Sequence, residues 1–172
     1  MPADEDLVQA VARGDGGALA ELCGRWERPL FAFLARHTGG RDVEDLYQET
    51  WLRVVRAAPR FDPSRRFSTW LFHIALNLAR DWRRRAPPEP VDTATDDAGH
   101  PGATARVDAA LDASRLLAAL PEPQREVVLL RYYHDLGEDE VAAIVGCPRG
   151  TVKSRLHQAM ARLARLAGGA TS

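Results

Sequence analysis

The chain has 172 residues, 45% of them hydrophobic and 27% charged, with a net charge of −1 and two cysteines. Its length suits one large or two small domains, and its apolar content is sufficient for packed cores. It has no apolar run of about 18 residues, and its N-terminus, MPADEDLVQA, lacks the pattern of a signal peptide, so we expect a cytoplasmic protein without membrane insertion.

Four helical patterns fill the N-terminal half of the sequence. They cover Leu7 to Val11, Leu19 to Leu34, the segment DVEDLYQETWLRVV before Pro59, and Ser68 to Arg85. Asp15 is placed to cap the second pattern, and Ser68 the fourth. No alternating strand pattern and no Asn-Gly hairpin turn occurs in the sequence. We therefore predict an all-α fold of two small helical domains.

The fourth pattern combines arginines with aromatic residues. Residues 53–85 hold nine arginines and two aspartates. Unpaired bases stack on aromatic rings while arginines follow the phosphates, so this helix suits single-stranded or melting DNA, through Phe67, Trp70 and Trp82 beside the arginines of 80–85. For Trp70 alone, core packing is the simpler interpretation. Asn77 is equally compatible with an ordinary surface position and with contact to a base edge.

Residues 87–107 differ in composition from the rest. They hold four prolines, two glycines, four acidic residues, one arginine and no aromatic residue. Such a segment cannot bury enough apolar surface to offset the entropy of ordering it. We predict a flexible acidic linker at 87–107, which separates a domain of residues 1–86 from a domain of residues 108–172.

Between Asp135 and Leu163 two short amphipathic patterns are broken at Gly146-Cys147-Pro148. With about 100° per residue, the apolar stripe of the second pattern packs on that of the first. The first stripe is Val141, Ala142, Ile144 and Val145, and the second is Val152, Leu156, Ala159, Met160 and Leu163. The opposite face of the second pattern holds Gly150, Ser154, His157, Gln158 and Ala161.

The second pattern is also strongly basic, with five Lys or Arg and no acidic residue from Arg149 to Arg165. Small residues facing base edges and cations facing phosphates are typical of the DNA-reading helix of a helix-turn-helix. The alternative is an ordinary helical hairpin with a solvated basic face. The small residue Ala142, the sharp turn and Val152 beyond it favour the helix-turn-helix.

Neither the cysteines nor the carboxylates predict a metal or a cofactor. Cys23 and Cys147 lie far apart with no CxxC or Cys/His ligand spacing, and we expect buried thiols. Asp42, Asp45 and Glu49 recur at helical spacing, but no Glu-x-x-His pattern accompanies them. A solvated face or a polar face for a basic partner is the better interpretation of these carboxylates.

Three segments, DVEDLYQETWLRV, FSTWLFHIALNLARDWRRR and GTVKSRLHQA, occur in this order. With them the chain resembles the extracytoplasmic-function (ECF, group IV) sigma factors of bacterial RNA polymerase, over nearly its whole length. The resemblance implies a promoter-specificity subunit and not an enzyme. It implies a sigma region 2 domain at 1–86, which binds core polymerase and recognises and melts the −10 element, and a region 4 domain at 108–172, which recognises the −35 element.

The resemblance also implies roles for individual residues. Core polymerase binding, on the clamp helices of the largest catalytic subunit, falls to Asp45, Gln48, Glu49 and Leu52. Contact with −10 DNA falls to Phe67, Trp70, Asn77, Arg80, Arg83 and Arg84, with Asn77 beside a pocket for a flipped base. Contact with −35 DNA falls to Arg149, Thr151, Lys153, Ser154, Arg155, His157 and Gln158. Family members often carry arginine where this chain has Gln158, and glutamine favours adenine edges whereas arginine favours guanine.

Further partners implied by the resemblance are the flap of the second largest polymerase subunit and an anti-sigma factor. The acidic linker would thread toward the polymerase active-centre cleft, although a passive tether explains its composition nearly as well. Two other classes of function remain as alternatives. A stand-alone helix-turn-helix regulator usually dimerises through an added seam, which the sequence lacks, and a nuclease needs a convergent carboxylate or histidine cluster, which it also lacks.

Overall fold

The computed structural model describes residues 1–86 and 112–169, so the linker predicted at 87–107 lies outside the described residues. The chain divides into two compact units, residues 1–88 and 89–172, and each unit is described by itself. All regular structure in the described residues is helical, which confirms the all-α prediction.

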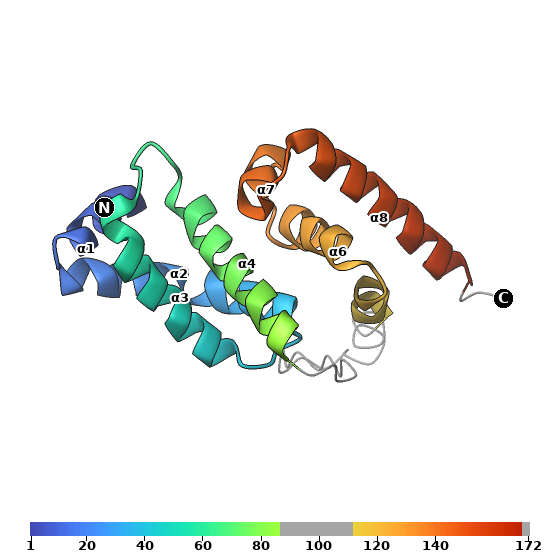
Figure 1. Ribbon diagram of the computed structural model, residues 1–172, viewed down its shortest axis with the longest axis horizontal. Helices are drawn as coiled ribbons and strands as arrows, with labels where there is room; N and C mark the ends of the chain where they lie inside the picture. Colours follow the sequence, from blue (N-terminus) through green and yellow to red (C-terminus); the bar gives the residue numbers. More distant parts are fainter. Residues whose placement is uncertain (87–111, 170–172) are drawn as a thin grey trace. The chain divides into compact units, whose positions relative to one another are not determined.

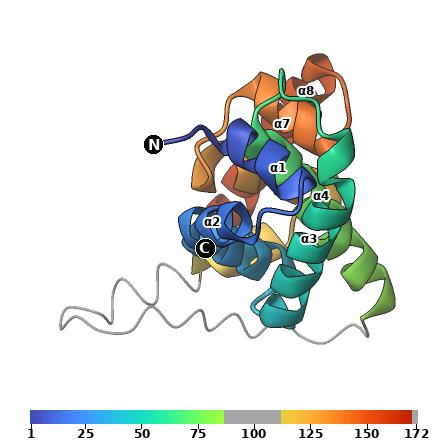
Figure 2. The same ribbon diagram turned by 90° about the vertical axis from the view of Figure 1, so that its left-hand side faces the viewer.

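The first unit contains four α-helices and one short 3-10 helix (Figure 1). They are α1 (Asp4–Ala12), α2 (Gly16–Thr38), α3 (Val43–Ala57), the 3-10 helix η1 (Ala58–Arg60) and α4 (Phe67–Arg85). Helices α2, α3 and α4 pack against one another in all three pairings, while α1 packs on α2 and η1 (Figure 2). The core of the unit therefore lies between three long helices.

Aromatic rings contribute much of this core. Phe33 of α2 and Phe72 of α4 stack with ring centroids 4.7 Å apart. Phe67, at the start of α4, is fully buried and meets the edge of Trp26 at 5.9 Å. Such aromatic contacts add to the free energy gained by removing apolar area from water.

The predicted helix caps had different outcomes. Asp15 caps α2 as predicted, since its Oδ1 accepts hydrogen bonds from the backbone N–H of Gly17 (2.9 Å) and Ala18 (3.1 Å). The prediction for Ser68 is wrong, because α4 already begins at Phe67. The Phe67 N–H instead donates to Oε1 of Glu5, 2.8 Å away and on α1. A carboxylate from another helix replaces the local cap, and its charge favours the N-terminal end of the α4 dipole.

The second unit contains α6 (Glu122–Val128), the π-helical turn η2 (Leu129–Tyr133), α7 (Glu138–Val145) and α8 (Arg149–Gly169), and residues 112–118 are also helical. Helix α8 packs against both α6 and α7 (Figure 1). Gly146 joins α7 to α8 in the left-handed conformation, with φ of +79°, a backbone conformation that glycine adopts without strain. The predicted pair of helices with a sharp turn is thus present.

Most of the apolar stripes predicted for α7 and α8 are buried. Val141, Ile144 and Val145 of α7 and Val152, Leu156 and Ala159 of α8 all belong to the core. Ala142 and Leu163 are half-buried, and Met160 departs most from the prediction, because 38% of it is exposed. It lies about 80° around the helix from Val152, at the edge of the stripe, so α6 and α7 do not cover it.

Candidate nucleic-acid interface

Helix α8 presents the polar face predicted from the sequence. Gly150, Ser154, His157, Gln158 and Ala161 are all exposed. They lie opposite the buried stripe, so most of this side of the helix is turned away from α6 and α7, and Gln158, at its edge, reaches α6. The face is narrow and carries small side chains at its start, which permits the close approach that a helix in a major groove requires.

The residues predicted for −35 contact divide into two groups by exposure. Thr151 and Arg155 are half-buried, and the Arg155 Nη1 lies 3.8 Å from the Cys147 Sγ in the turn. The others are exposed, namely Arg149, Lys153, Ser154, His157 and Gln158. Helix α8 itself contains no acidic residue, so its surface offers phosphates a row of cations.

Three of these exposed side chains have partners in neighbouring elements that the sequence did not reveal. Nζ of Lys153 lies 3.9 Å from Oε2 of Glu138 on α7. The Gln158 Oε1 accepts a hydrogen bond from Nε2 of Gln124 on α6, at 3.5 Å. The Arg149 Nε donates to Oε2 of Glu138 on α7, at 3.0 Å, and this hydrogen bond raises the pKa of the Arg149 guanidinium. Helical periodicity describes one helix at a time, so no sequence signal pointed to any of these contacts.

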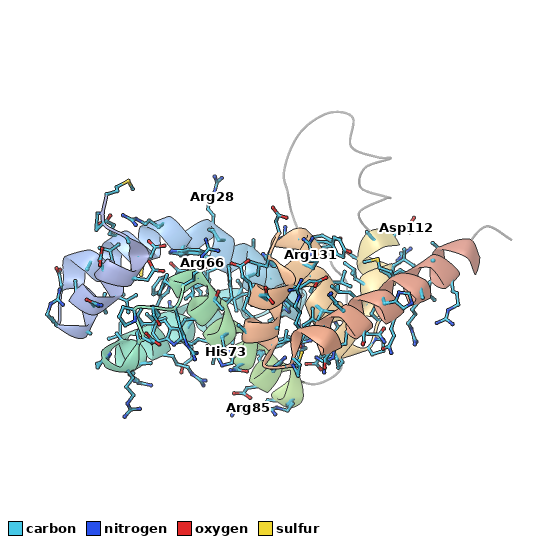
Figure 3. The ribbon with its side chains drawn as sticks, turned by 90° about the horizontal axis from the view of Figure 1, so that it is seen from above. Arg28, Arg66, His73, Arg85, Asp112 and Arg131 are labelled. Atoms are coloured by element: carbon cyan, nitrogen blue, oxygen red, sulfur yellow. The ribbon has the colours of Figure 1, made fainter. Side chains whose placement is uncertain are left out.

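Helix α4 carries the residues predicted for −10 contact. Asn77 is half-buried, and its Nδ2 lies 3.1 Å from Nε2 of His73 one turn earlier. Figure 3 shows His73 midway along α4 and Arg85 at its C-terminal end. Trp70 is half-buried and tilts against Phe61, with ring centroids 4.8 Å apart. The helix therefore presents an amide, part of an indole ring and several cations.

The predicted arginines of α4 lie along its last two turns. Arg80 and Arg83 are half-buried, whereas Arg84 is exposed and pairs with Asp81. Cations at the C-terminal end of a helix are favoured by its dipole, so this cluster is stable without DNA. The exposed Arg84 is able to meet a phosphate, whereas the Nε and Nη1 atoms of Arg83 are buried.

Phe67 does not fit its predicted role in DNA contact. The side chain is 0% exposed and is enclosed by other aromatic rings, including Trp51 with a centroid separation of 6.5 Å. A ring without exposed surface cannot stack on an unpaired base. The prediction for Phe67 is therefore wrong for this structure, because packing of α4 against α1 and α3 uses the ring for the core.

Trp82, which the sequence also predicted for base stacking, instead contacts the residues that precede α3. Its Nε1 donates to Oδ2 of Asp42 at 2.8 Å, and the Arg41 guanidinium lies 4.8 Å from its ring centroid. Asp42 precedes α3 and has a φ of +53°. The contact therefore ties the start of α3 to the end of α4 and gives Asp42 a role in the fold.

Helix α3 brings together the residues predicted for core polymerase binding. Asp45, Gln48 and Leu52 are exposed, and the half-buried Glu49 pairs with Arg53 at 3.3 Å. Half of the Leu52 surface is exposed, and Val55 on the same side is 39% exposed. The face is thus a polar and acidic stripe with an apolar centre, and Val55 is a member that the sequence prediction missed.

The described residues also bear on metals, membranes and thiols. In residues 1–86 and 112–169, no three histidine, cysteine, aspartate or glutamate side chains gather as metal ligands do. None of the helices in these ranges combines the length and apolar character needed to cross a bilayer. Cys23 and Cys147 are half-buried, less enclosed than predicted, and burial together with Glu27 raises the pKa of Cys23.

Comparison with known proteins identifies two family models in this chain. Residues 22–87 match the model described as Sigma-70 region 2, and residues 110–163 match the one described as Sigma-70, region 4. The sequence is 30% identical over 171 residues to the ECF RNA polymerase sigma-E factor of Escherichia coli K12, covering 91% of this chain and 90% of the relative. The ECF RNA polymerase sigma-E factor of Haemophilus influenzae is 29% identical over the same shares of both chains.

Two solved structures are similar over most of the chain. CnrH, solved in complex with the cytosolic domain of CnrY, has a TM-score of 0.76 and 31% identity, covering 99% of this chain and 100% of that one. The sigma factor RpoE of Bartonella quintana, solved with the anti-sigma factor NepR, has a TM-score of 0.70 and 24% identity, covering 87% and 96%. The second similarity concerns the fold alone.

Proposed function

We infer the role of each surface from one premise: this chain belongs to the ECF branch of the sigma-70 family of RNA polymerase sigma factors. It is a sigma factor, which binds core RNA polymerase and directs promoter-specific transcription initiation. The observation that carries this function is the presence of region 2 and region 4, in that order, in one chain. The alternative is a stand-alone helix-turn-helix regulator, and such a protein does not need a region 2 domain.

We propose that residues 1–86 form the domain that binds core polymerase and the −10 element. Its polymerase-binding face is the stripe on α3, made of Asp45, Gln48, Glu49, Leu52 and Val55. The carboxylates would steer a basic partner, and the exposed Leu52 would supply the apolar centre of the interface. The partner on core polymerase is the pair of clamp helices of the largest catalytic subunit.

Promoter opening is proposed for the surface of α4. Asn77 would contact a flipped base, and Trp70 would offer a partly exposed ring beside it. Extruding a base costs a few kcal/mol of unstacking, which contacts in a pocket and nearby phosphate contacts must offset. Arg80, Arg83 and Arg84 are the cations proposed for those phosphates. Phe67 is left out of this set because it is buried.

Recognition of the −35 element is proposed for residues 108–172, with α8 in the major groove. Ser154, His157 and Gln158 lie on the exposed face that would meet base edges, and Lys153 and Arg155 flank it. Glutamine pairs best with adenine, so Gln158 predicts an adenine where arginine would select guanine. The remaining partner proposed for this domain is the flap of the second largest subunit.

The family is one of DNA-binding regulators. We propose further that this chain has no catalytic activity of its own and acts in the cytoplasm. We also propose an anti-sigma partner, because CnrH, at 31% identity, was solved with another protein's cytosolic domain bound to it. The surfaces of α3 and α8 are exposed in this chain and would be the ones such a partner covers.

Run-off transcription with purified core polymerase tests the function directly. Core polymerase with this chain should produce promoter-dependent transcripts that core polymerase alone does not produce. A footprint by the chain alone on an operator, with no transcript from the reconstituted enzyme, would instead favour the stand-alone regulator. Start-site mapping after overexpression would then supply the promoter sequences.

A further inference from the structure

The N-terminal turns of α7 and α8 carry opposite charges. The first turn of α7 holds Glu138, Asp139 and Glu140, whereas α8 starts with Arg149, has Lys153 one turn later, and contains no acidic residue. The positive end of a helix dipole favours anions and disfavours cations. Arg149 and Lys153 therefore stand where the α8 backbone opposes their charge, unless acidic groups nearby compensate for it.

Acidic groups of α7 do compensate for it. Oε2 of Glu138 lies 3.0 Å from Nε of Arg149 and 3.9 Å from Nζ of Lys153. Oδ1 of Asp139 lies 3.5 Å from Nη1 of Arg149. The Glu138 side chain is 28% exposed and the Asp139 side chain 80%, so Glu138 is the more enclosed acid and the one that reaches both cations. Two carboxylates thus face two cations in this cluster.

Among residues 1–86 and 112–169, this compensation is found at one end of the helix. Arg155, Arg162 and Arg165 follow on α8, and the helix supplies no acidic residue to pair with them. Phosphate attraction is independent of sequence and grows with the number of cations that displace counterions. The part of α8 from Arg149 to Lys153 is therefore close to electrically neutral, while the rest of the helix retains its positive charge.

The orientation of the Arg149 guanidinium follows from the same contacts. Its Nε and Nη1 face carboxylates, and a guanidinium has five N–H donors in a planar fork. The Nη2 group carries two further N–H donors. They can serve one additional acceptor without breaking the pair with Glu138.

We propose that Glu138 is a specificity-determining residue of the −35 surface. By pairing with Arg149 and Lys153, it weakens their attraction to phosphates. This lowers affinity for DNA sites that lack the correct base edges. At the correct site, base contacts made by the exposed face of α8 offset the lost phosphate attraction. The inference rests on the proposed role of α8 in −35 recognition and adds a residue of α7 to it.

The test measures binding of the full chain to two DNA duplexes over a range of salt concentrations. One duplex is selected from a random pool by the wild-type chain, and the other is a scrambled version of it. In Glu138→Gln, affinity for the scrambled duplex should rise about fivefold to tenfold near 0.1 M salt, and the slope of log K against log salt should steepen by about 1 to 2. Affinity for the selected duplex should rise less, so the ratio of the two affinities falls.

Asp135→Asn is the matched control. It makes the same change in net charge, but Asp135 pairs with Arg131, at 4.0 Å, and not with α8. Its φ of +50° is one that asparagine also tolerates. This control should leave the affinity ratio and the salt slope near their wild-type values, and Glu138→Asp, which keeps the carboxylate, should do the same.

The double variant Glu138→Gln with Arg149→Gln should lose most of the gain in affinity for the scrambled duplex. An unchanged ratio and slope in a folded Glu138→Gln chain would overturn the inference, as would an equal effect of Asp135→Asn. Failure of the −35 proposal has a different signature, since the wild-type chain would then enrich no sequence from the pool.

Discussion

The side-chain nitrogen of Asn77 lies 3.1 Å from Nε2 of His73, one turn earlier on α4. The two side chains lie within hydrogen-bonding distance, and the ring nitrogen that faces Asn77 belongs to the same helix, one turn away. The pair leaves the carbonyl oxygen of Asn77 on the side of the amide away from His73. An orientation set before DNA arrives reduces the entropy that base capture must overcome.

Replacing Asn77 tests its proposed role in base capture. Asn77→Ala should slow open-complex formation while leaving the affinity for core polymerase unchanged, because Asn77 lies on α4 and not on the α3 face. Permanganate reactivity of promoter thymines measures open-complex formation, and a titration with core polymerase measures the affinity. His73→Leu removes the ring nitrogen that faces Asn77, keeps the Asn77 amide, and should cause a smaller loss. Equal loss of polymerase binding in Asn77→Ala would contradict the role.

Leu52 should contribute to polymerase binding and little to folding. Half of its surface is exposed, so Leu52→Ala should change the free energy of unfolding by less than about 0.5 kcal/mol. An apolar side chain at the centre of an interface contributes more to the free energy of binding than this leucine does to folding. We therefore expect about a tenfold loss of affinity for core polymerase. Leu166→Ala on α8, where 37% of the leucine is exposed, is the matched control and should leave the affinity for the clamp helices alone unchanged.

Phe67 should matter for packing and not for DNA contact. Phe67→Leu keeps an apolar side chain in the core and should cost about 1 kcal/mol of unfolding free energy, measured by urea denaturation. Because the ring does not meet DNA, the folded variant should still open promoters at close to the wild-type rate. A folded Phe67→Leu protein that binds core polymerase but opens no promoter would return Phe67 to the DNA-contact set.

The contact between Glu5 and the start of α4 should stabilise the first unit. Glu5→Gln removes the charge that faces the N-terminal end of α4 and weakens acceptance from the Phe67 N–H, so we expect a loss of about 1 to 2 kcal/mol. Asp6→Asn, at an exposed neighbouring position, makes the same charge change without this contact. The midpoints of thermal unfolding compare the stability of the two variants. Equal midpoints would show that the contact between Glu5 and Phe67 does not contribute to stability.

Gln158 should decide one base pair of the −35 element. Gln158→Arg should shift the preference at that position from adenine toward guanine, by roughly 1 to 3 kcal/mol if the contact is bidentate. Selection from a promoter library with the reconstituted polymerase measures the shift. Wild-type and variant proteins that select the same −35 sequences would remove Gln158 from the recognition face.

Much of the secondary structure was predictable because periodicity is a local property. The apolar positions from Val141 to Ala159 recur with the helical period and mark the buried sides of α7 and α8 correctly. Asp15 was predictable as a cap because the backbone N–H groups that donate to it are only two and three residues away. The exposed face of α8 followed from the same calculation, since the side opposite a buried stripe faces solvent.

The contacts between helices were not predictable from these patterns. Glu5 and Phe67 are 62 residues apart, and Asp42 and Trp82 are 40 apart, so nothing local relates them. Phe67 and Trp70 both looked suitable for stacking on bases. They lie about 60° apart around α4, and only the placement of neighbouring helices decides which ring is enclosed.

The sequence by itself determined the helices, the helix-turn-helix and the likeness to sigma factors. Each of these depends on the helical period, on turn residues or on the order of motifs, which are all properties of the sequence. The tertiary structure alone decided that Phe67 belongs to the core, that Glu5 caps α4 and that Glu138 pairs with Arg149 and Lys153. These relationships depend on distances of a few ångströms between separate helices. Packing sets such distances, and the spacing of residues within one helix carries no information about them.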